Sequence, residues 1–207
     1  VYELIDNGYD VVVADNLETG FRAAVHPKAR FYQGDIRNKE FCDHVFSSEK
    51  IDAVIHFAAN SQVGESMVNP LKYYDNNLGG TRTMLQSMIE HGVKYIVFSS
   101  TAATYGEPEK QPVTEQTPRK PATSPYGNTK QMCEDILRDS LAAYPGMKGI
   151  ALRYFNPIGA HPSALIGELP RGVPQNLVPY ITQTAAGLRE CLSVFGDDYP
   201  TPDGSNI

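Results

Sequence analysis

The sequence has little of what marks several large classes of protein. It contains three cysteines and carries a net charge of −6, with no basic block to offset its acidic residues. No apolar run approaches the ~20 residues that cross a bilayer, and no signal-peptide pattern opens the chain. These absences argue against a disulfide-stabilised secreted domain, a nucleic-acid-binding protein and a membrane protein. We expect a globular cytoplasmic protein with reduced cysteines and no nucleic-acid or membrane partner.

Several motifs of site chemistry are also missing. The five histidines show no metal-ligand spacing with each other or with the cysteines, so we expect no metal site. The chain contains no nucleophile elbow, no Walker loop and no glycine-rich dinucleotide loop. Residues 1–7 have the pattern of a helix end that stops at Gly8, so we expect a first strand and a glycine-rich loop upstream of Val1. The chain stops at Asn206-Ile207 without a terminating element, and we expect it to be a fragment.

Apolar runs alternate with helical patterns as far as Tyr154. The apolar runs lie at residues 11–14, 30–34, 53–57, 95–98 and 149–154. The helical patterns lie at residues 1–7, 41–46, 70–90 and 126–143. Alternation of this kind indicates βαβ units and parallel strands. The sequence therefore predicts an α/β fold with a doubly wound parallel sheet of the Rossmann type.

The composition changes after Tyr154, where a stretch rich in proline and glycine begins. A helical pattern at about residues 176–186 and an apolar run at 192–195 follow. We predict two domains. Residues 1–155 form a dinucleotide-binding domain that lacks its first strand and glycine-rich loop, and residues 156–207 begin a smaller substrate-binding domain.

A tyrosine and a lysine stand four residues apart at the start of the helix expected near residue 126. Ser124 suits the N-cap and Pro125 the first helical position, so Tyr126 and Lys130 share one helical face. A neighbouring cation favours the phenolate and lowers the tyrosine pKa towards the range useful for proton transfer. The strand expected at residues 95–98 is followed by the hydroxyl residues Ser99, Ser100 and Thr101. A hydroxyl at the end of this strand, Thr101, supports a catalytic site that includes Tyr126 and Lys130. The alternative is an exposed Tyr and Lys on a solvated helix face.

An aspartate ends the first apolar run. In a dinucleotide-binding fold, Asp15 would accept hydrogen bonds from the adenosine ribose hydroxyls and would favour NAD over NADP. The alternative is that Asp15 only forms a turn with Asn16. The residues alone leave both open.

Two further strand ends have residues suited to a cofactor. Asp35, followed by Ile36, could contact adenine, or it could cap the next helix. Phe57 is followed by Ala58 and Ala59, whose small side chains would let a cofactor approach the backbone. A close contact between helix and strand would explain the two alanines equally well.

Longer strings make the pattern specific. The main ones are His56-Phe57-Ala58-Ala59, Val63-Gly64-Glu65-Ser66, Tyr73-Tyr74-Asp75-Asn76-Asn77, Ser99-Ser100-Thr101, Ser124-Pro125-Tyr126-Gly127, Arg153-Tyr154-Phe155-Asn156-Pro157 and Phe195-Gly196-Asp197-Asp198-Tyr199-Pro200. With them, nearly the whole chain resembles the UDP-hexose 4-epimerases of the extended short-chain dehydrogenase/reductase superfamily. The Tyr-x-x-x-Lys spacing alone is typical only of the superfamily.

The resemblance implies an NAD-dependent isomerase that interconverts UDP-galactose and UDP-glucose by transient oxidation at C4 of the sugar. It implies that Tyr126 is the catalytic base and acid, that Lys130 lowers its pKa, and that Thr101 orients the sugar oxygen. The implied cofactor-binding residues are Asp15, Asn16, Asp35, Ile36, Phe57, Ala58, Ala59, Asn76, Tyr126, Lys130 and Tyr154. The implied UDP-sugar-binding residues are Thr101, Tyr126, Asn156, Asn176, Leu177, Ser193, Val194 and Phe195. The resemblance also implies a homodimer formed through the helix that carries Tyr126.

One local feature separates this chain from related sugar-nucleotide enzymes. Nucleotide-sugar 4,6-dehydratases resemble this pattern but carry acidic residues after the active-site threonine. In this chain Ala102-Ala103-Thr104 follow Thr101, so the resemblance implies an epimerase and not a dehydratase. Ser61 lies where some family members carry lysine, which departs from the family pattern at a cofactor contact. Two alternatives stay open: a C4 epimerase of UDP-N-acetylhexosamines or UDP-pentoses, and a non-catalytic dinucleotide-binding sensor.

Overall fold

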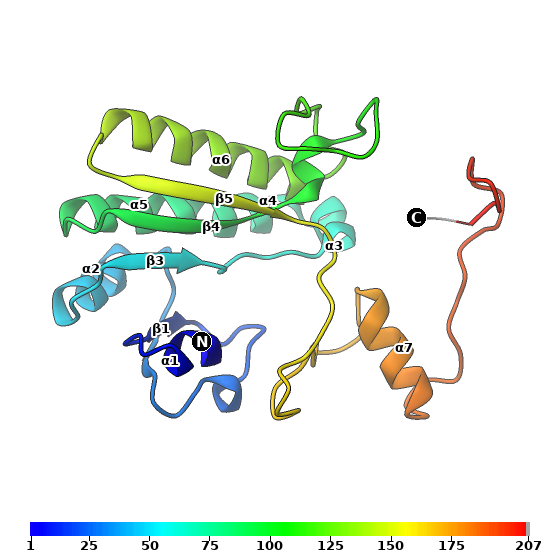
Figure 1. The fold of residues 1–207 in the computed structure, drawn as a ribbon, viewed down its shortest axis with the longest axis horizontal. Helices are drawn as coiled ribbons and strands as arrows, with labels where there is room; N and C mark the ends of the chain where they lie inside the picture. The colour runs from blue at the N-terminus through cyan, green and yellow to red at the C-terminus, as the bar shows by residue number, and fades with distance from the viewer. Residues whose placement is uncertain (206–207) are drawn as a thin grey trace. The chain divides into compact units, whose positions relative to one another are not determined.

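The computed structural model describes residues 1–205 (Figure 1). The chain divides into two compact units, Val1–Pro157 and Ile158–Ile207, and residues 206 and 207 lie outside the described part. Each unit is described by itself. The predicted assignment of a cofactor domain and a sugar domain, with its boundary after residue 155, stays a prediction.

The first unit contains five strands, all paired in parallel. They are β1 (Val12–Asp15), β2 (Arg30–Gln33), β3 (Ala53–His56), β4 (Tyr95–Thr101) and β5 (Lys148–Tyr154). The parallel α/β architecture predicted from the sequence is confirmed. The described strands form two sheets, β1-β2 and β3-β4-β5, because no described strand joins β1 to β3.

Helices connect the strands. The α-helices are α1 (Tyr2–Asp6), α2 (Lys39–Ser48), α3 (Val63–Val68), α4 (Pro70–Tyr73), α5 (Gly80–Glu90), α6 (Pro125–Ala143) and α7 (Leu177–Ala185). The other described helical elements are the 3₁₀ turns η1 (Arg22–Ala24) and η3 (Ala102–Tyr105) and the π-helical segment η2 (Tyr74–Gly79). The single helix expected at residues 70–90 is therefore three consecutive segments, with η2 between α4 and α5.

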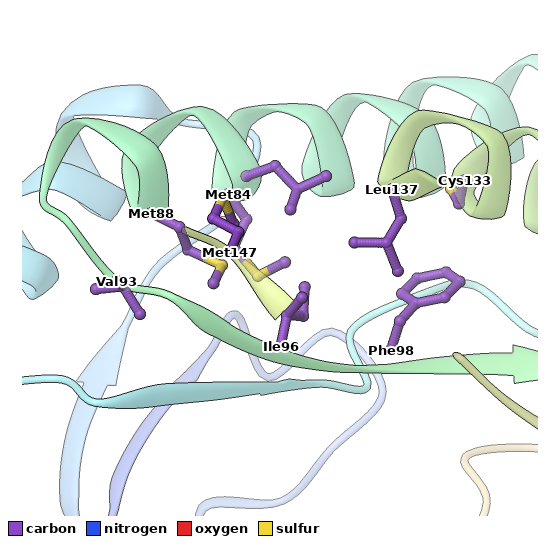
Figure 2. Close-up of a cluster of buried hydrophobic side chains, with 9 residues drawn as sticks. Met84, Met88, Val93, Ile96, Phe98, Cys133, Leu137 and Met147 are labelled. Carbon is purple, nitrogen blue, oxygen red and sulfur yellow. The ribbon is translucent and has the colours of Figure 1, made fainter. Parts of the chain in front are cut away.

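The main hydrophobic core lies between β4 and the helices α5 and α6 (Figure 2). Burial alternates along β4, so Ile96, Phe98 and Ser100 are buried while the residues between them are not. The core residues are Met84, Leu85, Met88, Val93, Ile96, Phe98, Cys133, Leu137 and Met147. Burial of one large apolar side chain contributes about 1.5–3 kcal/mol. The core therefore fixes α6 firmly against β4.

The second unit is largely loop around α7. Pro174 and Pro179 are fully buried, whereas Leu165, Val194 and Phe195 are highly exposed. The helix expected at residues 176–186 is present as α7, and residues 192–195 form neither strand nor helix. Within residues 1–205, no helix combines the length and apolar character needed to cross a bilayer.

Candidate active site

The carboxyl ends of β4 and β5 coincide. Parallel pairing places Thr101, the last residue of β4, opposite Tyr154, the last residue of β5. The Thr101 side-chain oxygen accepts a hydrogen bond from the backbone N–H of Ala103 at 3.2 Å, which caps the η3 turn. This bond holds the Thr101 hydroxyl at the point where the chain leaves the sheet.

Helix α6 begins as the sequence predicts. Ser124 is its N-cap, and its hydroxyl accepts a hydrogen bond from the Gly127 N–H at 3.1 Å, with Pro125 in the first helical position. Tyr126 therefore lies in the first turn, where its ring makes an edge contact with Tyr73 at 6.5 Å between centroids. The Thr101 hydroxyl lies near enough to the phenol to favour its ionised form. The first turn of α6 thus meets the end of β4.

Lys130 lies one turn further along α6 and is buried, at 4% exposure. Its ammonium donates a hydrogen bond to the Ser99 carbonyl at 2.7 Å and lies 5.0 Å from the centre of the Phe98 ring. Burial lowers its pKa to about 8. The alternative of a solvated Tyr and Lys on an exposed helix face therefore does not describe Lys130.

The pKa of Tyr126 moves in the direction opposite to the one expected from the sequence. Burial raises the pKa of the phenol, and the nearby Thr101 hydroxyl only opposes that rise. In the described geometry, the Lys130 ammonium is hydrogen-bonded to the Ser99 carbonyl, and removal of the phenol from water has the larger effect. The structure thus brings Thr101, Tyr126 and Lys130 together, with a phenol that keeps its proton at neutral pH.

A buried asparagine that the sequence analysis did not single out joins this site to β3. Asn77 is 2% exposed and its side-chain amide makes four hydrogen bonds. Its oxygen accepts from the N–H of Asn60 at 2.8 Å, and its nitrogen donates to the Asn60 carbonyl at 3.0 Å. Its nitrogen also donates to the Thr129 hydroxyl at 3.0 Å, and its oxygen accepts from Asn76 at 3.0 Å. Asn77 therefore links the loop after β3 to the helix that carries Tyr126 and Lys130.

The π-helical segment η2 carries Asn77. Segments of this kind are rare and are frequent at functional sites. The available signal was the run Asn76-Asn77-Leu78-Gly79-Gly80, because asparagine and glycine are poor helix formers within a helix. The single helix predicted at residues 70–90 does not contain this change of helical geometry.

Asp15 forms the local turn that was its alternative interpretation, although with a different partner. Its carboxylate accepts a hydrogen bond from the Leu17 N–H at 2.6 Å, and Asn16 accepts one from the Glu18 N–H at 2.9 Å. Leu17 adopts φ +59°, a conformation that non-glycine residues rarely occupy. The turn leaves Asp15 at the carboxyl end of β1, where a ribose contact stays a prediction.

Asp35 is held by an arginine. The guanidinium of Arg37 donates to it at 2.6 Å and also bonds to Asp75, and the hydrogen bond from Arg37 lowers the pKa of Asp35. The interpretation of Asp35 as a helix cap is wrong, because Asn38 caps α2 by accepting from Phe41 N–H at 2.9 Å. An adenine contact by Asp35 and Ile36 stays a prediction.

The remaining expected cofactor residues differ in accessibility. Phe57 is 63% exposed, Ala58 is exposed, and Ala59 and Tyr154 are partly buried. The Asn76 side chain is partly buried and donates to Asn77. Phe57, Ala58 and Ala59 follow β3, Asn76 lies on η2, and Tyr154 ends β5. Their cofactor contacts stay predictions.

The residues expected to hold a UDP-sugar are divided between the units. Thr101, Tyr126 and Asn156 belong to the first unit, and Asn156 is exposed. Asn176 precedes α7, and its side chain donates to Glu168 at 2.8 Å. The other residues, all exposed in the second unit, are Leu177, Ser193, Val194 and Phe195. A shared sugar site formed by these residues stays a prediction.

Comparison with known proteins places this geometry in a family. The model of the NAD dependent epimerase/dehydratase family matches residues 1–200. UDP-glucose 4-epimerase of Lacticaseibacillus casei is 55% identical over 207 residues, which are 100% of this chain and 62% of the relative.

Two solved structures are similar to this one. UDP-glucose 4-epimerase from Bifidobacterium longum, in complex with NAD+ and UDP, has a TM-score of 0.94 at 46% identity, covering 98% of this chain and 62% of that one. UDP-glucose 4-epimerase from Stenotrophomonas maltophila, with bound NAD and formylated UDP-arabinopyranose, has a TM-score of 0.92 at 45% identity, with 98% and 62% covered. The chain thus spans about 62% of the length of these relatives.

Proposed function

The chain belongs to the NAD dependent epimerase/dehydratase family, and we propose that the protein interconverts UDP-galactose and UDP-glucose with NAD as its cofactor. The observation that carries the proposal is the meeting of Thr101, Tyr126 and Lys130 at the end of β4. Similarity to relatives named UDP-glucose 4-epimerase supports it. Because this chain spans about 62% of those relatives, the proposal concerns the activity of the whole protein.

The residues at the strand ends fit a nicotinamide dinucleotide. The exposed Phe57 and the small Ala58 and Ala59 leave the chain after β3 open to a ligand. Asp15 offers a carboxylate to ribose hydroxyls, and Lys130 offers an ammonium at the carboxyl end of β4. When bound, a cofactor of this class accepts a hydride from a sugar carbon and later returns it.

Tyr126 is the group that exchanges a proton with the 4-hydroxyl of the sugar. The pKa of Lys130, about 8, keeps its ammonium mostly charged at pH 7, one helical turn from Tyr126. Thr101, whose hydroxyl favours the ionised form of the phenol, orients the sugar oxygen. Acid–base transfer by a positioned side chain contributes a factor of about 10²–10⁴.

The residues after Thr101 favour epimerisation over dehydration. Ala102, Ala103 and Thr104 form the η3 turn and supply no carboxylate that would drive loss of water from the sugar. Epimerisation at C4 would need loss of the proton from the 4-oxygen, removal of the hydride from C4 to the bound cofactor, and return of both with the hydride on the opposite face. Tyr126 and Lys130 provide the groups that this proton transfer requires.

The sugar-nucleotide contacts and the assembly are part of the same proposal. Asn156, Asn176 and Leu177 would hold the UDP-sugar together with Ser193, Val194 and Phe195. Helix α6, which carries Tyr126, would form the contact of a homodimer.

A second candidate is an epimerase of UDP-pentoses, because one similar structure contains formylated UDP-arabinopyranose. A panel of UDP-galactose, UDP-N-acetylgalactosamine and UDP-arabinose separates the candidates. We expect turnover of UDP-galactose to be the fastest. Turnover of UDP-arabinose without turnover of UDP-galactose would favour the second candidate, and turnover of none would favour a sensor.

The test of the leading proposal uses the protein expressed from its complete reading frame. We expect Tyr126→Phe to reduce the conversion of UDP-galactose to UDP-glucose by at least about 100-fold, because the proton-transfer group is lost. Tyr144→Phe, at the exposed end of α6, is the matched control and should keep wild-type turnover. Unchanged turnover of Tyr126→Phe would remove Tyr126 from the mechanism.

A further inference from the structure

A largely enclosed carboxylate, that of Glu134, lies one helical turn after Lys130 on α6. The Glu134 side chain is 10% exposed. Its Oε1 accepts from the Ser100 hydroxyl at 2.6 Å and from Arg153 Nε at 2.9 Å, and its Oε2 accepts from Arg153 Nη2 at 2.7 Å. Arg119 adds a longer contact at 3.5 Å. Four segments of the chain therefore meet at one carboxylate.

This carboxylate is charged at neutral pH. Burial raises the pKa of Glu134, but the hydrogen bonds from Arg153 and Ser100 outweigh burial and the net pKa is lowered. Two parallel bonds from one guanidinium fix both position and orientation of a carboxylate. A buried ion pair by itself is weak evidence for stability. The Glu134–Arg153 pair is therefore better explained by the residues that it holds in place than by a gain in stability.

The partners of Glu134 stand next to the proposed site on two strands. Ser100 lies opposite Arg153 in the register, and the next pair along is Thr101 and Tyr154. Because side chains alternate between the faces of a strand, an anchor at Ser100 also sets the direction of Thr101. Glu134 and Lys130 are four residues apart on one face of α6. Both are hydrogen-bonded to the end of β4, Glu134 to Ser100 and Lys130 to Ser99.

The turn after Thr101 is held by the same cluster. The guanidinium of Arg153 lies 4.7 Å from the centre of the Tyr105 ring. Gln131 of α6 donates to the Thr104 carbonyl at 2.9 Å and to the Lys120 carbonyl at 2.6 Å. The segments before and after Thr101 are therefore both tied to α6.

We propose that Glu134 is a positioning residue that sets the Thr101 hydroxyl against the Tyr126 phenol by holding Ser100 and Arg153. The inference rests on the proposed function for its kinetic consequence, but the mechanical role does not depend on it. A shift of about 1 Å in a reacting group can cost about 100-fold in rate. Loss of the hydrogen bond between Glu134 and Ser100 therefore lowers kcat and leaves binding of the sugar nucleotide largely unchanged.

The kinetic test uses Glu134→Asp, which keeps the charge but is one methylene too short to reach both partners. In the protein from the complete reading frame, we expect kcat to fall about 10-fold and KM to change less than about 2-fold. Ser100→Ala, which leaves the Glu134–Arg153 pair, should lower kcat about 3-fold. Asp139→Asn, an exposed acid on α6 paired with Arg138, is the control and should match the wild type. Wild-type kcat in Glu134→Asp, or a change confined to KM, would overturn the proposal.

A second readout separates this inference from the proposed function. Hydrogen exchange of peptides covering residues 99–106 should be at least about 5-fold faster in Glu134→Asp and unchanged in Asp139→Asn. Exchange equal to the wild type would overturn the positioning role. Absence of epimerase turnover in the wild type, together with faster exchange in Glu134→Asp, would reject the proposed function and keep the positioning role. If Glu134→Asp does not fold, Ser100→Ala provides the same comparison.

Discussion

The ends of β4 and β1 are built in different ways. At the end of β4, the site is held by side chains from distant segments, with Lys130 bonded to Ser99 and Asn77 bonded to both Asn60 and Thr129. At the end of β1, Asp15 is held by Leu17, two residues along the chain. The first arrangement depends on tertiary packing and the second on a local turn. Substitutions among the residues that hold the end of β4 should therefore lower the free energy of unfolding more than substitutions in a local turn.

The largest effect is expected from Asn77→Ala. The substitution removes one hydrogen bond each from the partly buried N–H and carbonyl of Asn60 and from the buried hydroxyl of Thr129, so we expect the free energy of unfolding to fall by about 3 kcal/mol. Asn76→Ala, which loses one partly buried bond, is the matched control and should cost less than about 1 kcal/mol. Urea denaturation measures both. Equal losses of unfolding free energy in Asn77→Ala and Asn76→Ala would show that the buried hydrogen bonds of Asn77 stabilise the fold no more than one partly buried bond.

An intermediate effect is expected from Lys130→Met as a function of pH. Burial lowers the pKa of Lys130 from 10.5 to about 8, so the unfolded chain binds more protons between these values. The stability of the wild type relative to Lys130→Met should therefore rise with pH, by about 2 kcal/mol between pH 7 and 10. Denaturation curves at pH 7, 8, 9 and 10 measure the difference. A difference that does not change with pH would contradict the buried, weakly solvated ammonium.

The smallest effect is expected from Arg37→Ala, near the end of β2. The Arg37 side chain is 39% exposed and bonds to Asp35 and Asp75, so its loss should cost less than about 1 kcal/mol at pH 7. Because Arg37 lowers the pKa of Asp35, this cost should shrink as the pH falls through the folded pKa of Asp35. Thermal unfolding at pH 7 and at pH 3 tests the trend. A cost as large as that of Asn77→Ala would contradict the small contribution expected from an exposed ion pair.

The same contrast explains how far the sequence could be interpreted. The strands, the Ser124 cap and the place of Thr101 follow from local patterns, and the structure agrees with them. The turn at Asp15 was also open to local reasoning. The hydrogen bonds of Asn77 to Asn60 and Thr129, and those of Glu134 to Ser100 and Arg153, join residues far apart in the sequence. No local pattern indicates them.

The pKa of Tyr126 shows the limit most clearly. Helical spacing correctly placed Tyr126 and Lys130 one turn apart on the helix that begins at Pro125, but it carried no information on desolvation. Burial of the phenol raises its pKa, and the ammonium is hydrogen-bonded to a backbone carbonyl. The direction of a pKa shift depends on the three-dimensional surroundings of both groups, which spacing alone does not specify.

The most direct test of the proposed reaction follows the hydrogen on C4 of the sugar. UDP-galactose carrying deuterium at C4 is converted by the protein from the complete reading frame in ordinary water, and the UDP-glucose formed is analysed by NMR. Return of the same hydride to the opposite face predicts that the product keeps its deuterium at C4. Replacement of that deuterium by solvent hydrogen would contradict the account.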